Sequence, residues 1–302
     1  MRNEFYYTSR DGKTQIRALE WIPDGEVKAV LQIVHGMAEH IERYHAFAAF
    51  LEEHGIYVTG NDHLGHGKSV VCAERLGYFQ EGEGNACVIS DIQQLRIQAT
   101  KKYPNVPYFM LGHSMGSFLL RQYLGLYGVG LSGAIIMGTG EQPEAVLTLG
   151  KVVCGLLARV KGWRYRSKLV HGFAVGAYEK KLGSAWISRN AENVKAYEAD
   201  PLCGFMFTVN GYYEMFTGMQ KMNRQEAKQK ASKNLPLLFV AGTDDPVGNY
   251  GKSVENIYKK YVDWGYRDVQ MHLYAGDRHE ILNEDDRITV YLDIRNWINA
   301  RL

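Results

Sequence analysis

Short apolar runs alternate with longer helical stretches over the first 140 residues. The apolar runs are bounded by Gly, Pro or Asn, as strands are, and they cover residues 14–21, 29–34, 57–61, 108–111 and 134–137. Between them, helices are predicted over residues 41–53, 88–102 and 117–127. In the second of these, Ile92, Leu95 and Ala99 repeat at spacings of three and four, which is typical of a helix with one buried face. Alternating strands and helices predict a mostly parallel sheet with helices on both faces.

The order of elements also predicts how the chain is divided. A short turn at Asp11 and Gly12 indicates that the first two strands pair antiparallel at one edge. Residues 141–234 show helical patterns and no convincing strand. The later elements are strands at 236–241 and 269–274 and helices at 253–264 and 287–299. One α/β core, formed by residues 1–140 and 235–302 and interrupted by a helical insertion, explains this order more simply than two tandem domains.

Residues 111–117, Leu-Gly-His-Ser-Met-Gly-Ser, contain the strongest chemical signal in the chain. They follow a predicted strand and precede a predicted helix, which is the context of a nucleophile elbow. Glycines two residues before and two after Ser114 leave room for the tight turn that exposes its hydroxyl. The following helix N-terminus favours developing negative charge. Ser114 is therefore the candidate nucleophile.

A serine nucleophile needs a base, and the base needs a carboxylate that orients it. Only three histidines follow Ser114 in the sequence. His171 lies in the helical insertion and His272 lies within a predicted strand. His279 follows the turn after that strand, at the carboxyl edge of the sheet where sites form. We therefore expect His279 to be the base.

Two further features complete the candidate chemistry. The strand at 236–241 ends just before two adjacent aspartates, Asp244 and Asp245, and chemistry alone does not separate them as the orienting acid. An oxyanion hole needs two backbone N–H donors, one after the nucleophile and one from an earlier strand–helix loop. Met115 supplies the first, and the loop after the strand at 29–34 predicts Met37 as the second.

Together these segments resemble the α/β-hydrolase superfamily, and within it the monoacylglycerol lipase and lysophospholipase group of serine hydrolases. The motifs are His-Gly-Met-Ala-Glu-His at 35–40 with Arg-Tyr at 43–44, Asp-His-Leu-Gly-His-Gly-Lys-Ser at 62–69, Gly-His-Ser-Met-Gly at 112–116 and Gly-Thr-Asp-Asp at 242–245. The resemblance implies an α/β-hydrolase fold in which residues 141–234 form a helical cap (lid). It also selects Asp245, because the family's acid stands three residues after the glycine.

Composition narrows the function classes. Hydrophobic residues make up 46% and charged residues 23% of the 302 residues, the balance of a globular chain. The formal net charge of +2 gives no global field that would recruit nucleic acid. The four cysteines form no CxxC pair, and the N-terminal residues show no signal-peptide pattern, so a cytoplasmic location is expected. Histidines near the start miss zinc-site spacings, and the triad chemistry requires no cofactor or metal.

The sequence thus predicts a serine carboxylic-ester hydrolase acting on acyl esters such as monoacylglycerol or lysophospholipid. Two alternatives remain open: an aminopeptidase of the same fold, similar to prolyl aminopeptidases, and a non-catalytic ligand-binding member. Five aromatic residues of the insertion are expected either to line an apolar pocket or to pack in the core: Phe205, Phe207, Tyr212, Tyr213 and Phe216.

Charge is distributed unevenly between the two parts of the chain. Residues 141–234 contain 15 Lys and Arg but 8 Asp and Glu, so the insertion is basic while the remainder is acidic. Apolar residues such as Leu156 and Leu169 are interleaved with the basic ones. Such a pattern predicts either a solvated basic face or peripheral contact with a lipid interface.

Overall fold

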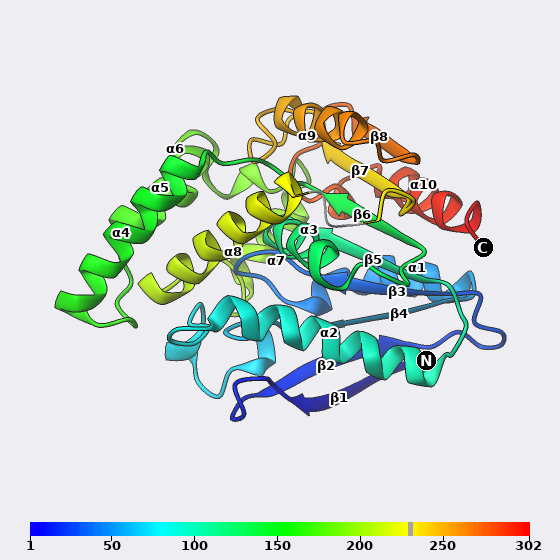
Figure 1. Cartoon of the computed structure of the whole chain (residues 1–302), viewed down its shortest axis with the longest axis horizontal. Helices are drawn as coiled ribbons and strands as arrows, with labels where there is room; N and C mark the ends of the chain where they lie inside the picture. The colour runs from blue at the N-terminus through cyan, green and yellow to red at the C-terminus, as the bar shows by residue number, and fades with distance from the viewer. Residues whose placement is uncertain (229–231) are drawn as a thin grey trace.

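The computed structural model describes residues 1–228 and 232–302 of the chain. It contains one eight-stranded sheet with the order β1-β2-β4-β3-β5-β6-β7-β8 (Figure 1). The strands are β1 (Arg2–Thr8), β2 (Gln15–Trp21), β3 (Ala29–Val34), β4 (Ile56–Asn61), β5 (Tyr108–His113), β6 (Gly133–Met137), β7 (Leu237–Gly242) and β8 (Val269–Tyr274). Only the pairings of β2, with β1 and with β4, are antiparallel. The mostly parallel sheet predicted from the alternating pattern is confirmed.

Helices cover both faces of this sheet. They are α1 (His45–Glu53), α2 (Gly84–Lys102), α3 (Met115–Tyr127), α4 (Glu144–Lys161), α5 (Lys168–Ala174), α6 (Gly176–Leu182), α7 (Ala191–Ala199), α8 (Val209–Ala227), α9 (Lys252–Asp263) and α10 (Arg287–Asn299). The predicted helix over 41–53 begins instead with a separate 3-10 turn, Ile41–Tyr44, before α1. Strand β1 does not appear among the predicted apolar runs because most of its side chains are exposed. It pairs antiparallel with β2 across the turn at Asp11 and Gly12.

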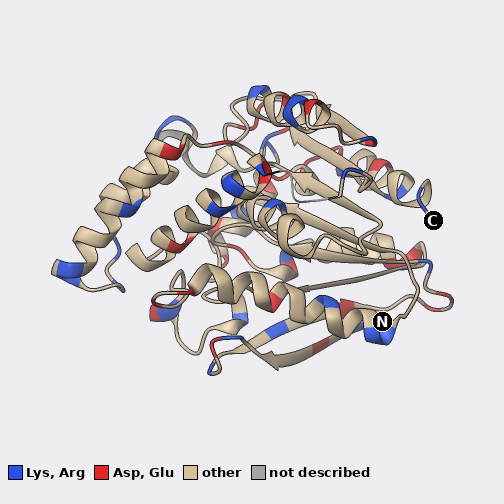
Figure 2. Ribbon diagram, in the orientation of Figure 1, with Lys and Arg blue, Asp and Glu red and all other residues tan. Residues whose placement is uncertain are grey.

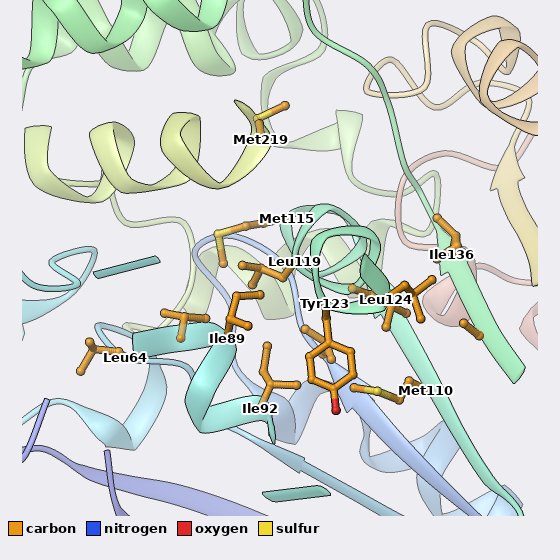
Figure 3. Packing of buried hydrophobic residues seen from close by; sticks show 14 of the residues in the cluster. Leu64, Ile89, Ile92, Met110, Met115, Leu119, Tyr123, Leu124, Ile136 and Met219 are labelled. Carbon is orange, nitrogen blue, oxygen red and sulfur yellow. The ribbon is translucent and has the colours of Figure 1, made fainter. Parts of the chain in front are cut away.

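The core consists of two layers separated by the sheet. Neighbouring residues of β5 point to opposite layers: Met110 joins the cluster under α2, α3 and α8, and Phe109 joins the cluster under α1 and α10. Figure 3 shows the first cluster, in which Met115, Leu119 and Tyr123 of α3 lie among residues from several elements. Strands β3 to β7 are buried along their whole length, which explains why their sequences are mostly apolar and show no alternation of apolar and polar residues.

The segment between β6 and β7 is helical throughout its described regular elements, α4 to α8. Helix α8 lies between α4 and the core helices α2 and α3, and it packs against all three (Figure 1). It approaches the core closely, because a side chain at Gly218 would come within 2.4 Å of Asn85. The Glu214 carboxylate also accepts the Asn85 N–H at 2.9 Å. The insertion is therefore built into the core through α8.

The buried ion pair between Arg121 of α3 and Glu226 of α8 is a second such attachment. Two nearly parallel hydrogen bonds of 2.7 and 2.8 Å join the guanidinium to the carboxylate, and Tyr261 also donates to Glu226. The Arg121 and Glu226 side chains are 3% and 9% exposed. A buried charge that loses its partner is strongly destabilising.

We expect Glu226→Ala to lower the free energy of unfolding by about 3–5 kcal/mol, because it leaves the Arg121 charge buried and unpaired. Urea denaturation followed by circular dichroism measures this change. The double variant Arg121→Met/Glu226→Leu should recover most of the loss, since neither charge then remains. A double variant as unstable as the single one would contradict this account.

Candidate active site

Ser114 occupies the sharp turn between β5 and α3. Its backbone angles, φ 53° and ψ −121°, lie in a region that L-residues rarely adopt. The turn is possible because its glycines allow close backbone approach: a Cβ on Gly116 would lie 1.9 Å from the Val34 carbonyl oxygen. The Ser114 N–H donates to the Met137 carbonyl at 3.0 Å. Such strain persists where the surrounding structure fixes it, and it is typical of functional turns.

The two adjacent aspartates have different environments. Asp245 is fully buried, and its Oδ2 lies 3.0 Å from His279 Nδ1 while its Oδ1 accepts the Val247 N–H at 2.8 Å. Asp244 is exposed. The structure thus brings Asp245, and not Asp244, together with His279, although the local sequence did not distinguish them.

The other two candidate histidines lie elsewhere. His171, in α5, faces Tyr212 and Glu179, with ring nitrogens 2.6 and 3.0 Å from their oxygens. The His272 side chain, in β8, is half-exposed and lies 3.7 Å from Asp293. Neither is paired with Asp245.

A cavity of about 660 Å³ opens beside these residues. Ser114, His279, Met37 and Met115 line it from the core. Across from them, α4 and α5 contribute mainly apolar side chains: Val146, Leu147, Leu149, Val153, Leu169 and Phe173. Among the described lining residues there is no Lys or Arg, whereas four are glutamates.

The predicted pocket aromatics divide into two groups. Phe205 and Phe216 line the cavity. Phe207 and Tyr212 are fully buried in the core, and Tyr213 packs against it. Both expectations for these residues are therefore met, each by part of the set.

The loop after β3 places Met37 near Ser114. A Cβ on Gly36, the preceding residue, would lie 3.1 Å from the Ser114 Cβ. In the described part of the chain, neither the Met37 nor the Met115 N–H donates to another protein group. Both donors therefore remain available to a ligand in the cavity.

Glu39 connects this loop to His113, the residue before the candidate nucleophile Ser114. Its Oε1 accepts the Gly36 N–H at 2.5 Å and the Tyr44 hydroxyl at 2.9 Å, and lies 3.2 Å from His113 Nδ1. Burial would raise the pKa of Glu39, but the hydrogen bond and charge of His113 and the charge of Arg43 lower it to about 2. Burial would likewise lower the pKa of His113, but Glu39 raises it. A protonated His113 can donate its other N–H, from Nε2, to the His279 carbonyl at 3.2 Å.

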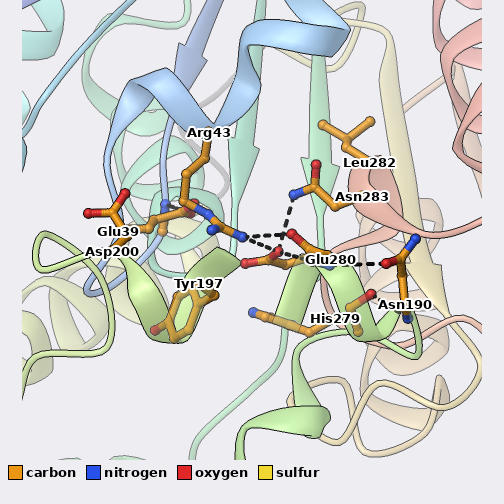
Figure 4. A network of polar contacts seen from close by, with 12 residues as sticks. Glu39, Arg43, Asn190, Tyr197, Asp200, His279, Glu280, Leu282 and Asn283 are labelled. Carbon is orange, nitrogen blue, oxygen red and sulfur yellow. Dashed lines mark hydrogen bonds and ion pairs between the residues drawn. The ribbon is translucent and has the colours of Figure 1, made fainter. Parts of the chain in front are cut away.

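Arg43 extends the same network to Glu280, the residue after His279 (Figure 4). Its guanidinium pairs with Glu280 and lies 3.6 Å from Glu39. Asn193 of α7 and Asn283 also donate to Glu280, at 2.7 and 3.1 Å. Sequence patterns did not reveal this network, because its members lie up to about 240 positions apart in the chain.

Only one set of residues in the described ranges has potential metal-ligand atoms close together: His40, Asp200 and Cys203. Its atoms lie within 4.8 Å of one another, but His40 Nε2 and Asp200 already pair at 2.8 Å. Of the early histidines considered from the sequence, His40 alone belongs to such a group among the described residues.

A family model described as "Serine aminopeptidase, S33" matches residues 25–286. The chain belongs to this family. Among the relatives of this chain, monoacylglycerol lipase of Mycolicibacterium smegmatis is 29% identical over 285 residues, covering 93% of this chain and 92% of the relative. Monoglyceride lipase of Rattus norvegicus is 27% identical, covering 93% and 86%. The fold is similar to a carboxyl esterase from Bacillus coagulans in complex with glycerol, with a TM-score of 0.90, 30% identity and coverage of 99% and 98%.

Three buried histidines, His35, His63 and His66, lie at the loop that contains Met37, a candidate oxyanion donor. His66 Nε2 accepts the Ala38 N–H at 3.3 Å, and His35 Nε2 accepts the His63 N–H at 3.0 Å. Burial lowers the pKa of all three, to about 3 for His63 and about 4 for His66. The pKa of His66 in the folded protein lies below its ordinary value of 6.5. As the pH falls between these two values, the unfolded chain binds a proton at His66 and the native state does not, so the native state loses stability.

We expect His66 to make the free energy of unfolding fall as the pH drops from about 6.5 to 4, by about 3 kcal/mol for this residue alone. His66→Gln keeps an acceptor for Ala38 but does not titrate, so its stability loss over this range should be smaller by that amount. Urea titrations of both proteins at several pH values measure the difference. Burial raises the pKa of Asp277 to about 7, which gives an opposite slope, but that term cancels between the two proteins. Identical slopes would contradict the assignment.

Proposed function

We propose that the protein is a serine carboxylic-ester hydrolase that acts on amphiphilic acyl esters such as monoacylglycerol. The observation that carries the proposal is the position of Ser114 on its strained turn, beside the same mainly apolar cavity as the Asp245–His279 pair. An apolar cavity suits an acyl chain. The names of the relatives, monoacylglycerol lipase and carboxyl esterase, support the same substrate class.

In the proposed reaction, Ser114 attacks the acyl carbonyl while His279 accepts the hydroxyl proton through Nε2. Asp245, bound to Nδ1, holds the imidazole in the required tautomer and stabilises the imidazolium. The Met37 and Met115 N–H groups donate to the tetrahedral oxyanion. His279 then protonates the leaving alcohol and activates the water that hydrolyses the acyl-enzyme.

An aminopeptidase reaction is the second candidate, because the family model carries that description. Such a substrate needs free carboxylates near its amine. Two glutamates of the insertion line the cavity, but Glu141 pairs with Lys260 and Glu179 pairs with His171. Ester hydrolysis therefore agrees better with the charges in the cavity than an aminopeptidase reaction does.

We also propose that helices α4 and α5, residues 144–174, which we call the α4–α5 arm, make peripheral contact with lipid interfaces. Helix α4 exposes apolar side chains spaced four residues apart along one face, Val152, Leu156 and Val160, none of which lines the cavity. Exposed basic residues, Arg159 and Lys161, flank this stripe, and Figure 2 shows basic residues at intervals along the arm. Such a surface fits a membrane boundary. No helix in the described ranges is long and apolar enough to span a bilayer, and the four unpaired cysteines agree with the proposed cytoplasmic location.

The basic residues of the insertion are not equivalent. Arg166 donates to the backbone carbonyls of Leu76, at 2.8 Å, and of Met206. Arg164 lies 4.9 Å from the centre of the Tyr78 ring. These two arginines attach the insertion to the core, so a test of surface charge must leave them intact.

We expect Ser114→Ala to abolish hydrolysis of p-nitrophenyl esters and monoacylglycerol and to prevent labelling by a fluorophosphonate probe, since the nucleophile is absent. Asp245→Asn should lower kcat by about 10⁴-fold, whereas Asp244→Asn should stay within about threefold of wild type because this side chain is exposed. Steady-state rates on ester and aminoacyl-arylamide panels measure these effects. Faster turnover of the arylamides, or the opposite order of the asparagine variants, would contradict the proposal.

We expect the variant Leu156→Ser/Val160→Ser to weaken co-sedimentation with vesicles containing phosphatidylglycerol by at least about tenfold. Each of these exposed apolar side chains would contribute roughly 1.5–3 kcal/mol to binding when it becomes buried in the membrane. Hydrolysis of a short soluble ester should not change, because neither residue lines the cavity. Ile97→Ser, on the exposed side of α2, is the matched control. Equal vesicle binding by all three proteins would refute the lipid contact.

A further inference from the structure

The backbone of Ala38 adopts a strained conformation beside the oxyanion donor. Ala38 directly follows Met37, is 5% exposed, and has a φ of 53°. Residues with a Cβ rarely adopt this conformation, and it persists only where surrounding groups enforce it. The position of the Met37 N–H therefore depends on the groups that hold Ala38.

The helical insertion supplies two of those groups. The Ala38 carbonyl accepts the Gly204 N–H at 2.9 Å and lies 3.4 Å from the Tyr197 hydroxyl. The core supplies a third, His66, which accepts the Ala38 N–H. Gly204 itself has a φ of 65°, and a Cβ there would lie 3.3 Å from the Tyr197 ring. The carbonyl of Ala38 is thus held from the insertion and its N–H from the core.

Two side chains of the same loop make parallel attachments. His40, 6% exposed, pairs with Asp200 at 2.8 Å, and the other Asp200 oxygen accepts the Leu202 N–H at 2.8 Å. Arg43 donates to Asn193 at 3.2 Å and lies 4.9 Å from the centre of the Tyr197 ring. Figure 4 shows Arg43, Tyr197 and Asp200 on this side of the network.

We propose that residues 193–204 of the insertion are positioning residues for the oxyanion hole, acting on Met37 through Ala38 and His40. This inference rests on the proposed function, in which Met37 binds the oxyanion. Oxyanion donors must lie about 2.7–3.1 Å from the developing charge, and a misplacement of about 1 Å can cost roughly 100-fold in rate. The insertion therefore completes the catalytic geometry as well as covering the cavity.

Asp200 provides the cleanest test, because neither it nor His40 lines the cavity. Asp200→Ala should lower kcat for a soluble ester about 10- to 100-fold with KM changed less than threefold. Affinity for a trifluoromethyl ketone, whose adduct places an oxyanion in the same hole, should fall by the same factor as kcat/KM. Asp200→Asn keeps one acceptor oxygen and should restore part of both. A role confined to stability would change the melting temperature and leave the inhibitor-to-substrate affinity ratio unchanged.

Gly204→Ala tests the backbone contact independently. The added Cβ meets the Tyr197 ring, so the Gly204 N–H should shift away from Ala38, with the same parallel loss of kcat and inhibitor affinity. Gly12→Ala is the matched control, since it has a similar φ of 72° but no atom within 4 Å of the added Cβ and lies in the exposed β1–β2 turn. Its kinetics should match wild type.

The outcomes separate this inference from the proposed function. A wild-type protein that hydrolyses no ester and takes no fluorophosphonate label would overturn the proposed function. An active wild type with unchanged kcat and inhibitor affinity in Asp200→Ala and Gly204→Ala would overturn the inference alone. Activity that falls only in proportion to the folded fraction, measured by circular dichroism, would also overturn it. Tyr197→Phe, which loses only one hydroxyl, provides the same readout if the other variants fold poorly.

Discussion

The buried carboxylate of Glu39 joins the segment after β3 to β5, and through Arg43 it is linked to the loop that contains His279 and Glu280. It accepts the N–H of Gly36, contacts His113 next to Ser114, and lies beside Arg43, which pairs with Glu280 next to His279. A charge at 4% exposure is costly unless it is paired and hydrogen-bonded. Since His113 belongs to β5 and the other partners belong to the segment after β3, the carboxylate is fully stabilised only when both occupy their native positions. The relative placement of Ser114, the candidate nucleophile, and of Met37, a candidate oxyanion donor, thus depends on the solvation of one anion.

The architecture was largely predictable from local sequence patterns, because parallel strands and amphipathic helices carry periodic signals. Strand β8 and helix α10 begin and end at the predicted residues. Boundaries failed where tertiary contacts replaced local propensity. Helix α2 begins at Gly84, four residues before the predicted start, in a glycine- and asparagine-containing stretch that is weakly helical by itself. Glu214 of the distant α8 accepts the Asn85 N–H there, and no local pattern contains that contact.

The candidate site was predictable to the extent that its residues lie in motifs. Ser114 and His279 could be selected from the strand–turn–helix context and the chain order. Asp244 and Asp245 could not be separated by chemistry, because only the course of the turn after β7 buries one and exposes the other. The supporting residues were harder still. Arg43 and Glu280 are ordinary charged residues in sequence, and their pairing appears only once β3 and β8 place their following loops at the same edge of the sheet.

The charge of the cavity also bears on how a hydrolytic cycle ends. The described lining contains glutamates and neither Lys nor Arg. A neutral ester can enter such a cavity without electrostatic cost, but hydrolysis converts its acyl group into an anionic carboxylate. That product finds no Lys or Arg among the described lining residues, and the four lining glutamates already pair with Arg43, Lys260 or His171. The same lining therefore offers a neutral ester mainly apolar contacts, whereas the anionic product gains no ion pair with a lysine or arginine that would hold it in the cavity.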